Sequence, residues 1–516
     1  MTARYLYLFA IGPVQAFIAQ ARRTQDLYMG SRMLSTLAGA GVRAAMQSAG
    51  FQPIFPVPQQ GFMFSDGDLR GTPHRFAFLS DAEPHALAAS VEKAIRERWH
   101  TQFAKRVKDW LLDTVGSGDW VSIFDQQSSN WLEFYWVAVP YDEKKHAESF
   151  KKANAALAQR KYARHFPQIE AAGEKCTLTG IQSALPFKEA QRERLTQAIG
   201  NIVIRPNERL GALALIKRLA GRYQANCFGE DFEVRSTTAI ARDQEHDDER
   251  TERLASEAGR GREVEGYLAI LHMDGDRMGK RLSELTSLKD HQEFSRKLSR
   301  FAQKVPEIVR TYGGRGGLLV YSGGDDVLAL LPLRHVLACA HALYQEFKQI
   351  TGLTASAGIA ITPHDLPLES ALELARKAEE TAKDDYGRDA LVFTEAHGTG
   401  QMRSAGANWG VVPFLEGLQA LFQSRKISSK LGYELQAIDH DLQAADMAEL
   451  RRAEILRVAK RRTAEGANFE RDVKPMMDHM IELVERRVIP TWSDMANWAI
   501  LARFLATDFE EKGKRA

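Results

Sequence analysis

The chain has 516 residues and 44% hydrophobic content, enough for about three or four domains with their own cores, which excludes a disordered or fibrous protein. Its 69 Lys and Arg residues nearly balance 67 Asp and Glu residues, so any surface for nucleic acid has to be local. Three scattered cysteines cannot build a disulfide framework or a four-cysteine zinc site, which favours a reduced, cytoplasmic protein without zinc. No apolar run approaches the length of a membrane span.

The N-terminal region begins with a buried strand. The apolar run from Tyr5 to Ile11 predicts this strand, and Gly12-Pro13 ends it. The helical spacing that follows predicts two helices that meet near residues 27–31, with Gly30 and Ser31 at the start of the second helix. Free backbone N–H groups and a small hydroxyl at a helix start suit a phosphate or a base edge, although Ser31 could equally be a plain N-cap.

Further elements of residues 1–140 follow the same kind of reasoning. We predict strands over 61–64, 74–79 and 131–139, with a long helix over 83–112 between the second and third of these strands. This order resembles that of residues 267–393 but lacks an acidic pair. The similarity of order predicts an internal duplication.

Residues 141–241 carry helical patterns and form a predicted α-rich middle domain. Here Lys217 and Arg218 lie opposite an apolar helix face, so they are either a solvated face or neighbours of phosphate or RNA. Residues 242–265 are highly charged and almost free of apolar residues, which indicates a linker.

A first acidic position follows the linker. Residues 267–273 read as a buried strand with Asp274 at its C-terminal end, and Gly275, Asp276 and Gly279 form the loop that opens a helix. The carboxyl end of a strand is where α/β sheets bind ligands. A helix is expected over 287–312.

A second acidic position lies at the tip of a predicted hairpin. Two apolar runs, 318–321 and 327–331, flank Ser322, Gly323, Gly324, Asp325 and Asp326. Adjacent, partly desolvated carboxylates repel each other, and a divalent cation is the simplest remedy. Mg²⁺ prefers carboxylate and phosphate oxygens, and glycines let a triphosphate approach the backbone. A Gly-Gly-Asp turn on its own is nevertheless an ordinary hairpin connector.

The elements after the hairpin complete a sheet. We predict a helix over 333–350, a strand over 354–361 and a helix over 367–383 that ends at Lys383. If the strand before Asp274 is central and pairs with the hairpin, Asp274, Asp325 and Asp326 meet at one sheet edge. Two Mg²⁺ or Mn²⁺ ions held there could align a 3′-hydroxyl for in-line attack on an α-phosphate.

Residues 397–516 read as a C-terminal helical bundle, with helices over 411–422, 430–445, 447–462, 468–487 and 493–509. The segment RRAEILRVAKRR, residues 451–462, has six basic residues and one acidic residue. This helix could contact RNA backbone or an acidic neighbouring subunit, or it could be a solvated face.

Two motifs carry a family resemblance. The pairing of MDGDRMGK with YSGGDDVLALLP resembles the palm domain shared by nucleotidyl cyclases, GGDEF-type cyclic-dinucleotide synthases and the large subunit of type III CRISPR effector complexes. The stretch IGPVQAFIAQARRTQDLYMGSRMLS resembles the opening of the large subunit of Cmr-type (type III-B) complexes, and similar segments continue in order over most of residues 4–395.

The resemblance implies an α+β fold with two ferredoxin-like, nucleotidyl-cyclase palm domains, a non-catalytic one at 1–140 and a catalytic one at 266–396. It implies synthesis of a 3′-5′ cyclic oligoadenylate from ATP when target RNA binds. Asp274, Asp325 and Asp326 would be catalytic and would hold two metal ions with help from Asp276 or the Gly275 carbonyl. The implied nucleotide-binding residues are Ser322, Gly323, Gly324, Gly275, Lys383, and Gly30 and Ser31 of the first palm.

The implied partners are the other subunits of a Cmr-type complex, the CRISPR guide RNA and the target RNA, with no membrane. Many related subunits begin with an HD nuclease domain, and we expect this chain to lack one because its His-Asp dipeptides are isolated from one another. Two alternatives stay open. The palm could make another product, such as a cyclic dinucleotide or an adenylate conjugate, or the chain could be a catalytically silent, RNA-binding structural subunit.

Overall fold

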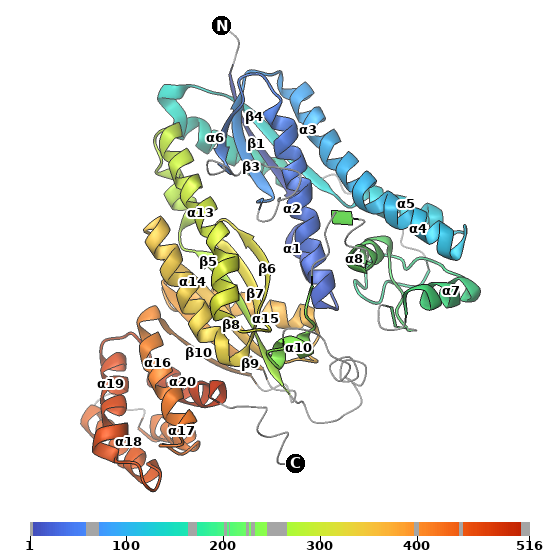
Figure 1. Ribbon diagram of the computed structural model, residues 1–516. Coiled ribbons are helices and arrows are strands. Elements are labelled where there is room, and N and C mark those ends of the chain that lie inside the picture. Colours follow the sequence, from blue (N-terminus) through green and yellow to red (C-terminus); the bar gives the residue numbers. More distant parts are fainter. Residues whose placement is uncertain are drawn as a thin grey trace. The chain divides into compact units, whose positions relative to one another are not determined.

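The computed structural model describes residues 4–57, 72–163, 173–200, 204–205, 207–222, 227–228, 233–244, 266–396, 402–442 and 447–506 (Figure 1). The chain forms two compact units. The first comprises Met1–Ser236, Arg277–Lys304 and Val320–Gly324, and the second comprises Thr237–Asp276, Val305–Leu319 and Asp325–Ala516. This division does not follow the boundaries proposed from the sequence, which remain a prediction.

The first unit is built on an antiparallel sheet of order β2-β3-β1-β4. Its strands are β1 (Tyr5–Gly12), β2 (Gln52–Phe55), β3 (Arg75–Ser80) and β4 (Glu133–Pro140). Leu6, Leu8 and Ala10 of β1 pack with α6 on one face of the sheet, whereas Tyr7 and Phe9 stack with aromatic rings of β3 on the other. Because both faces are covered, β1 is apolar throughout rather than alternating.

The helices of this unit account for most of its remaining chain. They are α1 (Gln15–Ala19), α2 (Thr24–Met46), α3 (Pro84–Trp99), α4 (Lys105–Val115), α5 (Trp120–Asn130), α6 (His146–Tyr162), α7 (Glu189–Ile199) and α8 (Ala212–Arg222). A π-helical turn, His100–Ala104, joins α3 to α4, so the long helix expected over 83–112 is confirmed with one irregular turn. The strands expected over 5–11, 74–79 and 131–139 are confirmed, whereas β2 and α5 were not predicted and residues 61–64 lie outside the described residues.

The expected helix start at Gly30 and Ser31 is wrong. The break between the first two helices falls at residues 20–23, so both residues lie inside α2 and are buried. A Cβ atom on Gly30 would lie 3.2 Å from the Cα atom of Ile18, so the glycine allows α1 to pack closely on α2. The proposed nucleotide contact at these two residues therefore loses its premise of free helix-start N–H groups, and an N-cap role for Ser31 is excluded.

Lys217 and Arg218 are not on a solvated helix face, and both are buried. Arg218 donates two hydrogen bonds to the buried carboxylate of Asp26, at 2.6 and 2.7 Å, and contacts Glu208 at 3.3 Å. Lys217 donates to the Phe17 carbonyl at 2.7 Å. These contacts attach α8 to α1 and to the start of α2, and they satisfy charges that burial would otherwise make costly.

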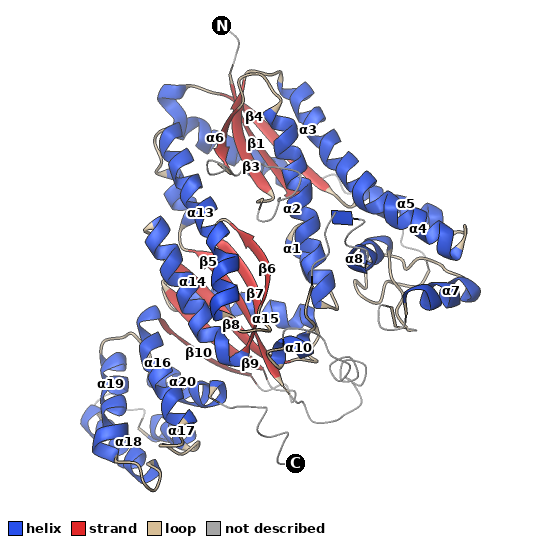
Figure 2. Cartoon of the chain, viewed as in Figure 1, coloured by secondary structure: helices blue, strands red, loops and turns tan. Residues whose placement is uncertain are grey.

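The second sheet has the order β10-β9-β8-β5-β7-β6 (Figure 2). Its strands are β5 (Tyr267–Gly275), β6 (Leu318–Gly323), β7 (Asp326–Pro332), β8 (Ala355–Pro363), β9 (Ala390–Ala396) and β10 (Met402–Asn408). The intervening helices are α12 (Met278–Ser283), α13 (Leu288–Tyr312), α14 (Val336–Thr351) and α15 (Leu368–Asp384). The strands, the hairpin and the three longer helices expected in this region are confirmed.

The two sheets share one topology. In the first, the central strand β1 lies between β3 and β4, and β2 extends the β3 side. In the second, β5 lies between β7 and β8, and β6 extends the β7 side. The helix after the fourth strand, α6 or α15, packs on the sheet in each case. This correspondence agrees with the predicted duplication, and the α+β fold class is confirmed.

The expected linker begins with an anchored residue. Asp243, which follows α10 (Thr237–Ala241), accepts a hydrogen bond from the Gly316 backbone at 2.8 Å and from Arg334 at 2.6 Å. These contacts, together with His335, hold the pKa of Asp243 far below its usual value despite partial burial. Residues 245–265 lie outside the described residues.

The C-terminal helices are α16 (Val412–Gln423), α17 (Leu431–Asp441), α18 (Ala448–Arg462), α19 (Lys474–Glu485) and α20 (Trp492–Leu505), as expected for a bundle. The basic helix α18 is largely paired within it. Arg461 and Arg462 both contact Glu434, and Arg452 contacts Asp478 at 2.7 Å. Across the described ranges, no helix combines the length and apolar character needed to span a membrane.

Candidate active site

Three predicted aspartates gather where β5 meets the β6–β7 hairpin. Asp274 is the penultimate residue of β5, Asp325 lies in the two-residue turn after β6, and Asp326 opens β7. Antiparallel pairing joins His272 to Leu328 and Met273 to Val327, so the next step of this register sets Asp274 opposite Asp326. Directly opposed residues in an antiparallel pair have Cβ atoms about 5 Å apart. The structure therefore brings the three carboxylates together.

The electrostatics of these aspartates reflect their crowding. Burial, followed by the charges of Asp274 and Asp326, raises the pKa of Asp325 to about 8. Burial also raises the pKa of Asp326 to about 6, against the opposing effect of His272, and one carboxylate oxygen of Asp326, Oδ1, is buried without a hydrogen-bond partner among the described residues. Negative charge at this edge is thus incompletely compensated.

Helix α15 supplies the positive charge that does reach the cluster. Lys383 Nζ contacts Oδ2 of Asp274 and lies 2.5 Å from Oε1 of Glu379, one turn earlier on the same helix. Glu379 also lies 3.7 Å from His272, whose other ring nitrogen is 3.5 Å from Asp326. Burial would lower the pKa of His272, but the nearby carboxylates of Glu379 and Asp326 outweigh it and raise that pKa.

Glu379 and His272 were missed from the sequence. His272 lies two residues before Asp274 and so faces the same side of β5, and Glu379 lies four residues before Lys383 on one face of α15; both spacings are visible in the sequence. What brings them together is Gly358 of β8, which pairs with His272. A Cβ atom there would lie 2.1 Å from the Glu379 backbone nitrogen, so only glycine allows α15 to pack this closely on the sheet.

Asp276 is close in sequence to Asp274, but its carboxylate makes different contacts. Its Oδ1 accepts a hydrogen bond from Ser356 at 2.7 Å, and its Oδ2 accepts from the Thr354 hydroxyl at 2.7 Å and from the Asp389 backbone at 2.9 Å. The carboxylate is buried and ties the end of β5 to β8 and to the loop before β9. These hydrogen bonds favour a positioning role for Asp276, and the metal ligation expected from the sequence stays a prediction.

Gly323 and Gly324 of the hairpin each require glycine on different structural grounds. Gly324 has φ of +84° and would have no neighbour within 4 Å of an added Cβ atom, so its backbone is both left-handed and open. A Cβ atom on Gly323 would instead collide with the Tyr321 ring. Ser322 is buried and donates its hydroxyl to the Ala302 carbonyl at 3.3 Å, and Gly275 is a buried end residue of β5. Gly324 is the residue best placed for close backbone approach.

The donor set fits a hard divalent cation. Within the described ranges, no three His, Cys, Asp or Glu side chains already surround one point as metal ligands, and the Lys383 ammonium lies against Asp274. The group nevertheless offers three closely placed carboxylates, one with a buried oxygen that accepts no hydrogen bond among the described residues, and carboxylate oxygens are the ligands that Mg²⁺ and Mn²⁺ prefer. Asp274, Asp325 and Asp326 are the residues that would hold such an ion.

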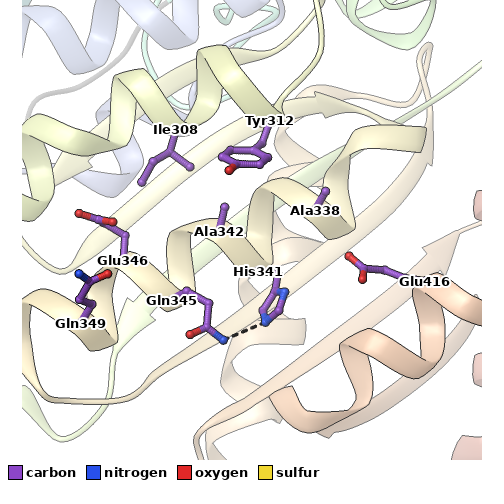
Figure 3. A pocket seen from close by; sticks show the side chains of 9 residues that line it. All are labelled: Ile308, Tyr312, Ala338, His341, Ala342, Gln345, Glu346, Gln349 and Glu416. Carbon is purple, nitrogen blue, oxygen red and sulfur yellow. Dashed lines mark hydrogen bonds between the residues drawn. The ribbon is translucent and has the colours of Figure 1, made fainter.

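A cavity elsewhere in the second unit is separate from this cluster. It has a volume of about 380 Å³ and lies between the end of α13, α14 and α16, where Tyr312, His341 and Glu416 contribute to its lining (Figure 3). Gln345 and His341 are hydrogen-bonded at 2.9 Å on its wall. None of the predicted site residues line this cavity.

Family comparisons agree with both motifs. Residues 267–392 match the family described as Cas10/Cmr2, second palm domain, and residues 6–104 match the family described as CRISPR-associated protein Cmr2, N-terminal. The resemblance to Cmr-type large subunits is confirmed. A curated relative, the CRISPR system Cmr subunit Cmr2 of Pyrococcus furiosus, is 27% identical over 259 residues. The matched region covers 42% of this chain and only 29% of that Cmr2 protein.

Solved structures share the fold. A chain of the type III-B Cmr-beta complex in the apo state matches with a TM-score of 0.66 at 12% identity, covering 90% of this chain and 78% of that one. The same complex bound to cognate target RNA matches with a TM-score of 0.67 at 13% identity, with coverages of 90% and 79%. A chain of the Csm1-Csm4 cassette in complex with cA4 matches with a TM-score of 0.53 at 15% identity, covering 97% and 70%. At these identities the likeness establishes the fold of the chain.

Proposed function

We propose that the chain is the large subunit of an RNA-guided, type III-B CRISPR antiviral complex and that it converts ATP into a cyclic oligoadenylate when target RNA binds. The observation that carries the proposal is the convergence of Asp274, Asp325 and Asp326 inside the region that matches the Cas10/Cmr2 second palm. Three carboxylates at one sheet edge are what metal-assisted phosphoryl transfer requires.

The residues divide into three roles. Asp274, Asp325 and Asp326 hold two Mg²⁺ or Mn²⁺ ions, which when bound would activate the attacking 3′-hydroxyl and neutralise charge on the phosphates. The open backbone at Gly324 lets the triphosphate approach, and Gly323 keeps the turn narrow. Asp276 fixes the end of β5, so that Asp274 and the Gly275 carbonyl stay at the edge of the site.

Lys383 is placed to contact both carboxylate and phosphate. Its ammonium lies between Asp274 and Glu379, where it compensates carboxylates that would otherwise be unpaired. If Oδ2 of Asp274 held a cation, Lys383 would release that oxygen, and its ammonium would have triphosphate oxygens as new acceptors. Lys383 then binds phosphate while Glu379 retains its contacts with the lysine ammonium and with His272.

The proposed partners follow from the family comparisons. We propose assembly with the other Cmr subunits, a guide RNA and a target RNA in the cytoplasm, since a Cmr-beta complex bound to cognate target RNA contains a chain of this fold. The proposal of ATP as substrate draws on Csm1-Csm4 cassettes of the same fold in complex with one ATP and with cA4.

The test uses the assembled complex with guide RNA, matched target RNA, ATP, and Mg²⁺ or Mn²⁺, and it identifies products by mass spectrometry. We expect cyclic oligoadenylates from the wild type and none from the D325N/D326N variant. The matched control is D384N/D385N, which neutralises an exposed Asp-Asp pair at the end of α15 and should keep full activity. A product containing another base or acceptor would favour the alternative nucleotidyltransferase, and ATP binding without turnover by wild type would favour the silent structural subunit.

A further inference from the structure

One strongly basic surface of the first unit has no role in the proposed chemistry. Residues 277–304, which form α12 and the first four turns of α13, carry eight basic and three acidic side chains, a net charge of +5 in a chain whose total is +2. Five of the basic residues lie on α13, and every one of them is exposed: Lys289, Arg296, Lys297, Arg300 and Lys304. We call these five residues the α13 stripe.

The α13 stripe lies on one side of the helix, and the exposed carboxylate of Glu293 lies on the same side. At 3.6 residues per turn, its five side chains fall within about 100° of the helix circumference. The opposite face is buried and includes Phe294 and Phe301. Arg296, Arg300 and Lys304 recur every fourth residue, so neighbouring cations are about 6 Å apart along the axis.

The buried face of this helix is fixed in place. Ser295 Oγ accepts a hydrogen bond from the Val57 backbone at 2.9 Å, Ser299 donates to the Val57 carbonyl at 3.0 Å, and Gln292 donates to the Pro53 carbonyl at 2.7 Å. His291 on the same face is hydrogen-bonded at 2.7 Å to the buried His146 of α6. The stripe is therefore presented outward on a rigid support.

Exposed cations on several other helices have carboxylate partners. Arg96 pairs with Glu92 on α3, Lys152 with Glu148 on α6 and Lys377 with Glu373 on α15. By contrast, Arg296, Lys297 and Arg300 form no ion pair or hydrogen bond among the described residues. Arg296 and Arg300 lie one turn apart and repel each other, so a bound anion would relieve that repulsion.

We propose that the α13 stripe binds the phosphate backbone of single-stranded RNA. Five exposed guanidinium and ammonium groups on one side of a helix, without aromatic side chains among them, can contact successive phosphates but provide no means of reading bases. This inference rests on the proposed function for its RNA partner. The basic helix α18, which the sequence also suggested for RNA, is a weaker candidate because its arginines are paired with Glu434, Glu454 and Asp478.

The test measures the affinity of the guide-loaded complex for matched target RNA and for an oligouridine without a match to the guide, over a range of NaCl concentrations. The variant is R296A/R300A, since alanine keeps the helix. Loss of two phosphate contacts should reduce the slope of log K against log salt by about 1.4 and weaken binding on the order of tenfold near 0.15 M salt. The matched control is K144A/K151A, which removes two exposed lysines of the same unit that have no ion pair within the described part of the chain, and it should leave the slope unchanged.

Each outcome decides the proposal. An unchanged slope in R296A/R300A would overturn it. If that variant also failed to retain another protein subunit, the stripe would be a protein interface. Cyclic oligoadenylate synthesis at saturating target RNA should persist in the variant. If the wild type made no product while the slope still fell in R296A/R300A, the proposed chemistry would fail and the RNA surface would stand.

Discussion

Replacing Asp325 by asparagine should stabilise the cation-free protein. The carboxylate has a pKa of about 8 in the fold and 3.8 in the unfolded chain, because burial and the charges of Asp274 and Asp326 disfavour ionisation. That difference in pKa corresponds to a loss of at most roughly 6 kcal/mol in the free energy of unfolding when Asp325 is ionised. Neighbouring Asp326 keeps 32% of its side chain exposed, so water screens the cluster, and we expect the variant to gain about 1–3 kcal/mol at pH 8.

The gain should depend on pH in a defined direction. Between pH 4 and pH 8 the unfolded chain releases a proton from Asp325 that the folded chain keeps, so the wild type loses stability as the pH rises. The asparagine side chain of the variant has no such proton to release. The difference between variant and wild type should therefore be near zero at pH 4 and largest at pH 8.

Thermal unfolding in a chelating buffer measures this difference. A gain of 1 kcal/mol raises the midpoint by about 2–4 °C for a unit of this size. Mg²⁺ or Mn²⁺ should then stabilise the wild type more than the variant, because the cation binds the native carboxylates. If the variant melted at or below the wild-type temperature at pH 8 in chelator, while D384N was unchanged, the carboxylates would not be crowded as described.

Three further predictions concern the support of the site. Gly358→Ala should lower the free energy of unfolding by about 1–3 kcal/mol and remove most of the ATP turnover, because the added Cβ atom displaces α15. The control is Gly279→Ala, whose added Cβ atom meets nothing within 4 Å, and it should change neither stability nor turnover noticeably. Lys383→Met should lower the free energy of unfolding in urea by about 1–3 kcal/mol, because it leaves the carboxylates of Asp274 and Glu379 without their cation. Lys377→Met removes an exposed ion pair and should lower it by less than about 0.5 kcal/mol. Asp276→Asn should lower the free energy of unfolding by about 1–3 kcal/mol, and with it the melting temperature, because hydrogen bonds are lost, yet the variant should still be stabilised by added cation. If only the stabilisation by cation were lost, Asp276 would be a ligand.

Much of the second sheet could be predicted because its signals are local. Apolar runs bounded by glycines defined β5, β6 and β7, and the strand end at Asp274 followed from where the apolar run stops. The register that sets Asp274 opposite Asp326 then follows from a short hairpin beside a central strand. The grouping of three aspartates was therefore accessible from the sequence, whereas their catalytic role remains a proposal.

The errors arose where tertiary contacts decide. Helix α2 is buried on nearly all sides, so it lacks the amphipathic pattern that marks a helix start, and the small residues Gly30 and Ser31 were taken for a break. The contacts of Asp276 could not be predicted either, because its carboxylate accepts from Thr354 and Ser356, which lie far along the chain; its role as a metal ligand stays a prediction. No local pattern reports a hydrogen bond across such a separation.

The charge balance of the site unites these observations. When ionised, Asp274, Asp325, Asp326 and Glu379 carry four negative charges, and Lys383 with protonated His272 carries two positive ones. The remaining deficit of two charges equals one divalent cation, and the raised pKa values of Asp325 and Asp326 show that protons compensate for it in part when no cation is bound. A second cation would exceed the charge of the protein ligands, so it is expected to enter with the triphosphate, whose own negative charge completes the balance. On this reasoning the first cation binds without nucleotide and the second binds only with it.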